Sequence, residues 1–254
     1  MVRMKIIQWT RRFGLIPAMA VFVCLLGVPT AAKANLVANG SFEATSLTGP
    51  GGFLCGAGST SSTCASTVTD WTATCSSQGC LSTNSPASLV TGNGSAFNGG
   101  FGLAGSPVNS PDGGYYIADD GDPTYSSLLS QTITGLTQGQ AYTVSFYQAG
   151  ASQGDISDPT SADWQVSLGG ETEQSPTMNT PADGFTPWSL QTLTFVADGT
   201  SALLSFLSQG TPSGEPPLAL LDGVSVNAVP EPATLGLLCA GSVGALVARR
   251  RRRT

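Results

Sequence analysis

The sequence predicts an all-β domain, a jelly-roll or a related β-sandwich, because short stretches of alternating apolar and polar residues recur along it with turn residues between them. The chain is also rich in glycine, serine, threonine and asparagine, which suits short strands joined by long loops. No amphipathic helix of useful length is predicted between its two ends. Residues 35–228 are enough for one such domain with a proper core.

The predicted strands can be placed one after another. The clearest contains Tyr142, Val144 and Phe146 with polar or amphipathic residues at the alternate positions. A turn at residues 137–140 connects it to an earlier strand at residues 129–133. The other predicted strands lie at residues 36–42, 68–72, 87–91, 114–118, 164–168, 192–195, 202–206 and 218–226.

The N-terminus has the pattern of an export signal. A positively charged stretch precedes an apolar run at residues 13–28, and residues 32–34 form a small-x-small cleavage site. We therefore expect a signal peptide at residues 1–34, cleaved between Ala34 and Asn35. A retained signal anchor is the alternative, and the cleavage site argues against it.

The C-terminus, residues 229–254, has three parts. The triplet Pro230, Glu231 and Pro232 is followed by an uncharged run at residues 233–248 and then by five arginines at residues 249–253. Because proline cannot continue a helix, the triplet marks a boundary. The uncharged run predicts a short transmembrane helix, and the arginines are expected to stay cytoplasmic.

This three-part tail resembles the PEP-CTERM sorting tail of exported bacterial proteins. The resemblance implies that the tail holds the protein in the inner membrane of a Gram-negative bacterium. It also implies a partner, an exosortase-type membrane protease that removes the tail, after which the protein reaches the cell surface or the extracellular matrix. An ordinary C-terminal anchor that is never cut is the alternative.

The charges limit the possible functions. All ten lysines and arginines lie in residues 1–33 and 249–253, there is no histidine, and all sixteen acidic residues lie between them. Nucleic-acid binding is therefore excluded, because phosphate contacts need basic side chains. Catalysis by a histidine or lysine base is excluded as well. A buried carboxylate in this domain needs backbone donors, a proton or a metal cation, and calcium is the natural candidate.

Four cysteines remain outside the two ends: Cys55, Cys64, Cys75 and Cys80. An even number in an exported chain indicates disulfides. Short loops favour pairing the first with the second and the third with the fourth, but all three pairings stay open. A zinc site is the alternative, although the spacings differ from the usual knuckles.

Three stretches, at residues 35–43, 129–146 and 221–226, are similar to the galactose-binding-like jelly-rolls that are common among carbohydrate-binding modules and bacterial surface proteins. In many members of that fold a structural calcium joins the first strand to the last. The resemblance implies ligands from the side chains of Glu43 and Asp222 and from backbone oxygens near Asn39 and Ser41.

The alternation in the last predicted strand supports that calcium site. Asp222 has the same parity as Leu218, Leu220, Val224 and Val226, so we expect its carboxylate to point toward the apolar side. The alternative is a bulge at Gly223 that turns Asp222 to water.

Other residue patterns are weaker. Tyr115 and Tyr116 could form a surface site that stacks on sugars. The acidic run at residues 119–122 is typical of a solvated turn, with a weak calcium site as the alternative. Ser152 lies in a Gly-x-Ser-x-Gly pattern, but no histidine exists to activate it.

We therefore expect a non-catalytic, exported surface or matrix protein that binds or organises extracellular polysaccharide. The alternative is a secreted glycoside hydrolase using paired carboxylates, for which the candidates are Glu43, Glu171, Glu173 and Glu215. A purely structural coat protein is a third possibility.

Overall fold

The structure is a computed structural model that describes residues 35–47, 51–55, 67–75, 84–91, 103–104, 109–154 and 158–230. One compact unit, Lys33–Val229, contains all of these residues except Pro230. The predicted signal peptide and the predicted helix at residues 233–248 lie outside the described residues. Within those ranges no helix has the length and apolar character needed to cross a membrane.

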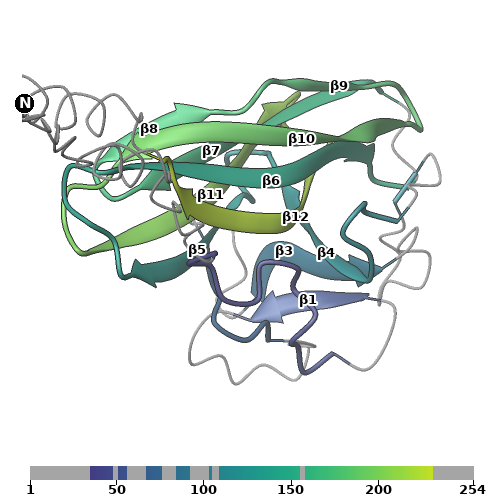
Figure 1. Cartoon of the computed structure of the whole chain (residues 1–254). Helices are drawn as coiled ribbons and strands as arrows, with labels where there is room; N and C mark the ends of the chain where they lie inside the picture. Colours follow the sequence, from purple (N-terminus) through teal and green to yellow (C-terminus); the bar gives the residue numbers. More distant parts are fainter. Residues whose placement is uncertain are drawn as a thin grey trace, which may run out of the picture. The chain divides into compact units, whose positions relative to one another are not determined.

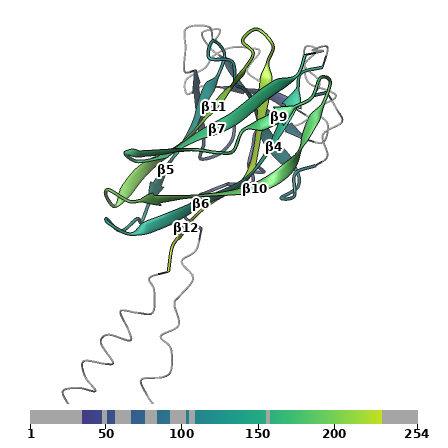
Figure 2. The same cartoon turned by 90° about the horizontal axis from the view of Figure 1, so that it is seen from above.

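The described residues form two antiparallel sheets packed face to face, so the predicted all-β sandwich is confirmed (Figures 1 and 2). The chain passes repeatedly from one sheet to the other, as in jelly-roll sandwiches. The first sheet has the order β1 (Gly51–Cys55), β3 (Asn84–Thr91), β4 (Tyr115–Asp120), β12 (Pro217–Ala228), β6 (Ala141–Ser152) and β10 (Phe185–Val196). The second has the order β2 (Thr72–Cys75), β5 (Ser127–Thr134), β11 (Ser201–Thr211), β7 (Thr160–Leu168) and β8 (Glu171–Gln174), and β9 (Met178–Thr180) also pairs with β7.

The main core lies between the two sheets. Trp164 on β7 and Phe206 on β11 come from the second sheet, Phe146 on β6 comes from the first, and all three are fully buried. The ring centroid of Phe206 is 5.2 Å from that of Phe146 and 6.1 Å from that of Trp164. Trp164 Nε1 donates a 3.1 Å hydrogen bond to the Leu220 carbonyl in the opposite sheet. These contacts fix how the sheets face each other.

Most predicted strands are confirmed, but two are wrong. The predicted strand at residues 68–72 contains a turn in which Asp70 has a φ of 69°, and β2 starts only at Thr72. The other wrong prediction is the opening strand at residues 36–42. Asn39 and Phe42 have positive φ angles of 49° and 59°, which non-glycine residues do not adopt in a regular strand. The Asn39 side chain stabilises the turn. Its Nδ2 donates to the carbonyls of Ala44 and Thr69, and its Oδ1 accepts a hydrogen bond from the Ala44 amide. The segment still follows β12, since Gly40 accepts a hydrogen bond from the Val224 amide.

The last strand, β12, contains the bulge at Gly223 that the sequence analysis gave as an alternative. Its register shifts between Asp222 and Ser225, and Gly223 has a φ of 58°. Leu218 and Leu220 consequently pack on the outer face of the first sheet, whereas Val224 and Val226 belong to the main core. The prediction of one shared face was therefore wrong. Asp222 lies on the outer side of the bulge, yet it is fully buried and does not face water.

Three of the described strands, β1, β8 and β9, were not predicted. Every side chain of β8 is exposed and polar, so no apolar alternation signals it. Glu171 and Glu173, two of the candidate carboxylates for a hydrolase, lie in this strand. The turn before it is formed by Gly169, whose φ of 64° suits glycine.

Candidate functional site

Asp222 is the centre of an acidic cluster at the start of the bulge in β12. Its Oδ1 accepts a 2.7 Å hydrogen bond from the amide of Gly223, and Ser110 also bonds the carboxylate. Oδ2 is buried and has no hydrogen-bond partner among the described residues. Burial, followed by the charges of Asp112 and Glu43, raises the pKa of Asp222 to about 7. The cluster therefore concentrates negative charge around an unsatisfied oxygen.

The other predicted calcium ligands are placed unevenly around this cluster. Glu43 is exposed, and its Oε1 accepts a 2.7 Å hydrogen bond from the Tyr115 amide on β4. The carbonyl of Asn39 already accepts bonds from Trp71 Nε1 and the Phe42 amide. Ser41 is half-buried in the same turn. Among the described residues, no group of three or more acidic, cysteine or histidine side chains is arranged to hold a metal ion.

The two predicted sugar-stacking tyrosines point to opposite faces of β4. Tyr115 is half-buried against the main core. Tyr116 is fully buried in a second apolar cluster on the outer face of the first sheet, 5.2 Å from the ring of Trp188. The prediction of a surface position is therefore wrong for Tyr116. Leu190 on β10 is the most exposed large apolar side chain among the described residues, at 58%.

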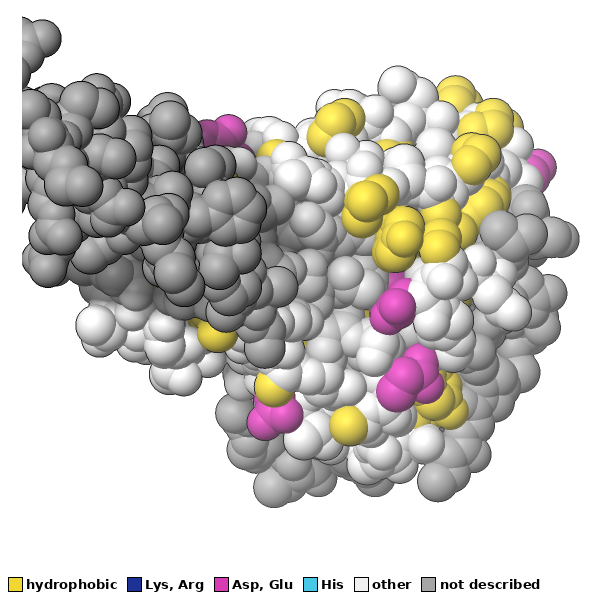
Figure 3. Space-filling view, in the orientation of Figure 1, with side chains coloured by type: hydrophobic (Ala, Val, Ile, Leu, Met, Phe, Trp, Pro, Cys, Tyr) yellow, Lys and Arg dark blue, Asp and Glu magenta, His cyan; other side chains and the backbone are white. Residues whose placement is uncertain are grey.

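Figure 3 shows hydrophobic side chains gathered on one face of the domain, with acidic side chains next to them. The described residues carry no basic side chain, because the sequence has none between residues 34 and 248. The described surface therefore has no cation that could attract an anionic ligand.

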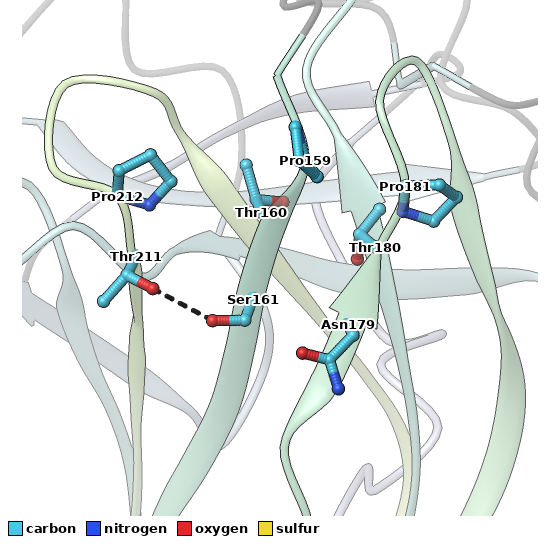
Figure 4. Close-up of a pocket in the computed structure, with 8 residues that line it drawn as sticks. All are labelled: Pro159, Thr160, Ser161, Asn179, Thr180, Pro181, Thr211 and Pro212. Carbon is cyan, nitrogen blue, oxygen red and sulfur yellow. Dashed lines mark hydrogen bonds between the residues drawn. The ribbon is translucent and has the colours of Figure 1, made fainter.

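A pocket that the sequence did not indicate, called the strand-end pocket below, opens at one end of the second sheet with a volume of about 530 Å³. Three strands reach their ends there: β7 begins, and β9 and β11 finish. Asn179, Ser161 and Thr211 lie side by side across these strands. A proline adjoins the end of each strand, so that Pro159, Pro181 and Pro212 form the rim (Figure 4).

This pocket is lined by five residues with polar side chains and by three prolines, and no ionisable group lines it. Ser161 Oγ and Thr211 Oγ1 are 3.0 Å apart and hydrogen-bonded, as the dashed line in Figure 4 marks. Asn179 is exposed, and its side-chain amide makes no hydrogen bond within the described part of the chain. This side-chain amide can therefore offer a donor and an acceptor to a ligand. The pocket is within the size range of small-molecule sites. It is suited to a neutral ligand that carries many hydroxyl groups.

A second groove, of about 420 Å³, lies where the N-terminal segment meets β5 and β11. Thr132, Thr134 and the half-exposed Leu203 line it, and the exposed carboxylate of Asp70 lies at its side. Unlike the first pocket, it contains an acidic group.

The acidic run at residues 119–122 is not the solvated turn that the sequence predicted. Asp119, Asp120 and Asp122 are all buried or nearly so, because β5, β11 and the loop after β11 cover them. Asp122 Oδ2 accepts bonds from the Ser213 hydroxyl and the Gly214 amide, and several such bonds lower its pKa although burial opposes them.

The remaining predicted residues have no catalytic arrangement in the structure. Ser152 is fully buried, and its hydroxyl donates to the Pro181 carbonyl at 3.2 Å. None of Glu43, Glu171, Glu173 and Glu215 lines the strand-end pocket. Cys55 and Cys75 end β1 and β2, while Cys64 and Cys80 lie outside the described residues, so the disulfides stay a prediction.

Comparison with known proteins identifies the C-terminal tail. Residues 228–253 match the model of the PEP-CTERM protein-sorting motif, which confirms the resemblance seen in the sequence. The motif indicates an exported protein that is processed at the membrane of a Gram-negative bacterium. A search of curated proteins finds none that matches the chain.

Several solved structures are similar to this chain at low identity. TmCBM61 in complex with β-1,4-galactotriose is 17% identical, with 77% of this chain and 99% of that one covered and a TM-score of 0.43. A CBM4 structure is 20% identical, with coverages of 76% and 99% and a TM-score of 0.35. The enzymatically active domain of tailspike protein 4 from bacteriophage CBA120 is 14% identical, with coverages of 77% and 21% and a TM-score of 0.39.

Proposed function

We propose that this protein is a non-catalytic, exported polysaccharide-binding protein of the cell surface or extracellular matrix, and that the strand-end pocket holds a neutral stretch of the polymer. The observation that carries the proposal is the lining of that pocket. Asn179, Ser161 and Thr211 offer amide and hydroxyl groups in a row, the proline rings offer apolar faces, and no charged side chain lines it. Sugars present the same mixture of hydroxyl groups and apolar C–H faces.

The sorting tail supports the location part of this proposal. The PEP-CTERM motif indicates export, which would bring the protein into contact with extracellular polymers. The acidic domain lacks the basic groups that would bind an anionic polymer directly, which favours a neutral ligand.

Binding should be tested with a panel of neutral polysaccharides in affinity electrophoresis. Asn179→Ala removes the free amide and is expected to weaken binding about tenfold, since one or two hydrogen bonds contribute about 1 kcal/mol each. Thr132→Ala, in the second groove of the same sheet, is the matched control and should bind normally. Equal weakening by both variants would contradict assignment to the strand-end pocket.

The same samples distinguish the alternative functions. Binding without release of reducing sugar supports the proposal. Release of reducing sugar that is abolished by substituting Glu43, Glu171, Glu173 or Glu215 would indicate the hydrolase instead. A protein that neither binds nor cleaves any polysaccharide of the panel would indicate a structural coat protein.

We also propose that a structural calcium ion binds at the Asp222 cluster, held by the carboxylates of Asp222 and Glu43. The support is the buried, unpartnered Asp222 Oδ2 and the accumulation of carboxylates without a neighbouring cation. Such a cluster is stabilised by a divalent ion with oxygen ligands. The carbonyl of Asn39 is not part of this proposal, because it already accepts two hydrogen bonds.

Removing calcium is expected to lower the Tm by several degrees, because an ion at a hundred times its Kd stabilises a fold by about 2.7 kcal/mol. The measurement is thermal unfolding with calcium and with a chelator. Asp222→Ala should melt at the lower temperature under both conditions, whereas Asp198→Asn, which changes an exposed carboxylate, should respond like the wild type. Identical wild-type melts with and without chelator would remove the calcium proposal.

A further inference from the structure

Asp119 connects the two sheets through the inside of the domain. It lies on β4 with the parity of the core residue Ile117, and its side chain is completely buried. Two serines of the opposite sheet approach its carboxyl group. Ser127 Oγ on β5 lies 2.7 Å from Oδ1, and Ser208 Oγ on β11 lies 2.9 Å from Oδ2.

The hydrogen atoms available at this contact determine the protonation state of Asp119. Ser208 Oγ also lies 2.6 Å from the carbonyl oxygen of Asp120. A hydroxyl has one hydrogen, and the shorter distance assigns it to the Asp120 carbonyl. Ser208 Oγ and Asp119 Oδ2 then meet at 2.9 Å and need a hydrogen between them. The carboxyl group of Asp119 is the group that can supply it.

The surroundings of Asp119 also disfavour its ionised form. The strands packed around Asp119 present no cation. β5 and β11 contribute the two serines, and β3 contains no ionisable residue. On β12, the residue paired with Asp119 is Ala219. The ionisable group that acts on it is Asp120, a like charge, and Asp120 in turn lies beside Asp122. Burial raises the pKa of Asp119 to about 7, although the Ser127 and Ser208 hydroxyls, which would both donate to an ionised carboxylate, oppose this.

We propose that Asp119 is a neutral carboxylic acid in the folded protein, that its proton bonds Ser208 and so joins the two sheets, and that the fold weakens as rising pH favours loss of this proton. The bonds run in one direction: Asp119 donates to Ser208, and Ser208 donates to the Asp120 carbonyl, while Ser127 donates to the second carboxyl oxygen. This pH sensitivity is independent of any bound ligand.

The sign of the pH effect follows from the two pKa values of Asp119. The unfolded chain loses this proton near the ordinary aspartate pKa of 3.8, whereas the folded protein keeps it until pH about 7. The stability that the proton provides is therefore complete below pH 3.8 and is lost as the pH rises through about 7. Within that window one such group raises the unfolding equilibrium constant about tenfold per pH unit. Asp120, whose pKa burial raises to about 6, acts in the same direction.

Asp119→Asn tests the proposal because an asparagine has the hydrogen-bonding pattern of the neutral acid. Its carbonyl can accept from Ser127 and its NH₂ can donate to Ser208, with no charge at any pH. The experiment is denaturant unfolding from about pH 4.5 to 6.5, with calcium in excess, on protein recovered after export from cells expressing the full chain. The unfolding constant of the wild type should rise about tenfold more per pH unit than that of the variant.

Asp198→Asn, which removes an exposed carboxylate, is the charge-matched control and should parallel the wild type. Parallel curves for the wild type and Asp119→Asn would overturn the proposal, because an ionised Asp119 gives no extra slope. If Asp119→Asn does not fold, carbon NMR of the Asp119 side chain in the wild type decides the question. A protonated carboxyl signal at pH 6 supports the proposal, and an ionised signal at that pH overturns it.

Discussion

Replacing Trp164 with alanine is expected to lower the free energy of unfolding by about 3–5 kcal/mol, a large share of the stability of a typical domain. Trp164 is fully buried between the sheets, and its indole packs against Phe206. Its Nε1 bonds the Leu220 carbonyl, so the substitution also leaves a buried acceptor without its donor. Because both contacts join different strands, we expect the loss to affect the whole sandwich.

Denaturant unfolding followed by circular dichroism measures this loss. Leu203→Ala is the matched control, because Leu203 is a large apolar residue on β11 that is 48% exposed. It should lose less than about 1 kcal/mol. A loss of under about 1 kcal/mol for Trp164→Ala as well would mean that the core is not packed around this residue.

Replacing Pro230, Glu231 and Pro232 with three alanines is expected to stop processing of the sorting tail, so that nearly all of the protein stays in the membrane fraction with its tail attached. The prolines prevent the predicted helix from extending beyond its start, and the glutamate is the charged residue between them. Three alanines would instead continue the helix and remove the acidic group, leaving the protease without the segment it recognises.

Fractionation of cells and immunoblotting of the chain measure this effect. Arg251→Lys keeps the positive charge of the terminal cluster and should be processed like the wild type. If the alanine variant is released from the membrane as efficiently as the wild type, residues 230–232 are not the recognition segment.

Alternation within single strands could be read from the sequence. Tyr142, Val144 and Phe146 were predicted to share one face, and all three are fully buried in the core. The opening segment could not be read in this way. Leu36 and Val37 begin an apolar run, but the side chain of Asn39 closes a turn that ends the alternation. Local hydrogen bonding by an asparagine side chain overrides a weak strand pattern.

The candidate site depends on contacts between distant strands, and these are harder to predict. Threonine next to proline occurs at residues 159–160, 180–181 and 211–212, which line the strand-end pocket. The same pairing also occurs at residues 123–124, 176–177 and 186–187, so it does not mark the pocket in the sequence. Which strand ends meet is decided by the sheet order. The burial of Asp119 was missed for the same reason, because its partners Ser127 and Ser208 come from the opposite sheet.

The position of Asp222 shows how a single glycine changes a face. The sequence offered two alternatives, an inward carboxylate or a bulge that exposes it. The structure combines them: the bulge at Gly223 places Asp222 on the outer side, where residues around it still bury it completely. Parity gives the face of a side chain only as far as the next bulge.

We expect the acidic domain to leave the cell between two positively charged ends that are both removed. The decisive measurement is the intact mass of the protein recovered outside the cells. We expect a chain that begins at Asn35, ends before the arginines at residues 249–253, and is lighter by four hydrogen atoms because its four remaining cysteines form two disulfides. A chain with Met1 and Thr254 both present and all of its thiols reduced would mean that neither end is removed and that no disulfide forms.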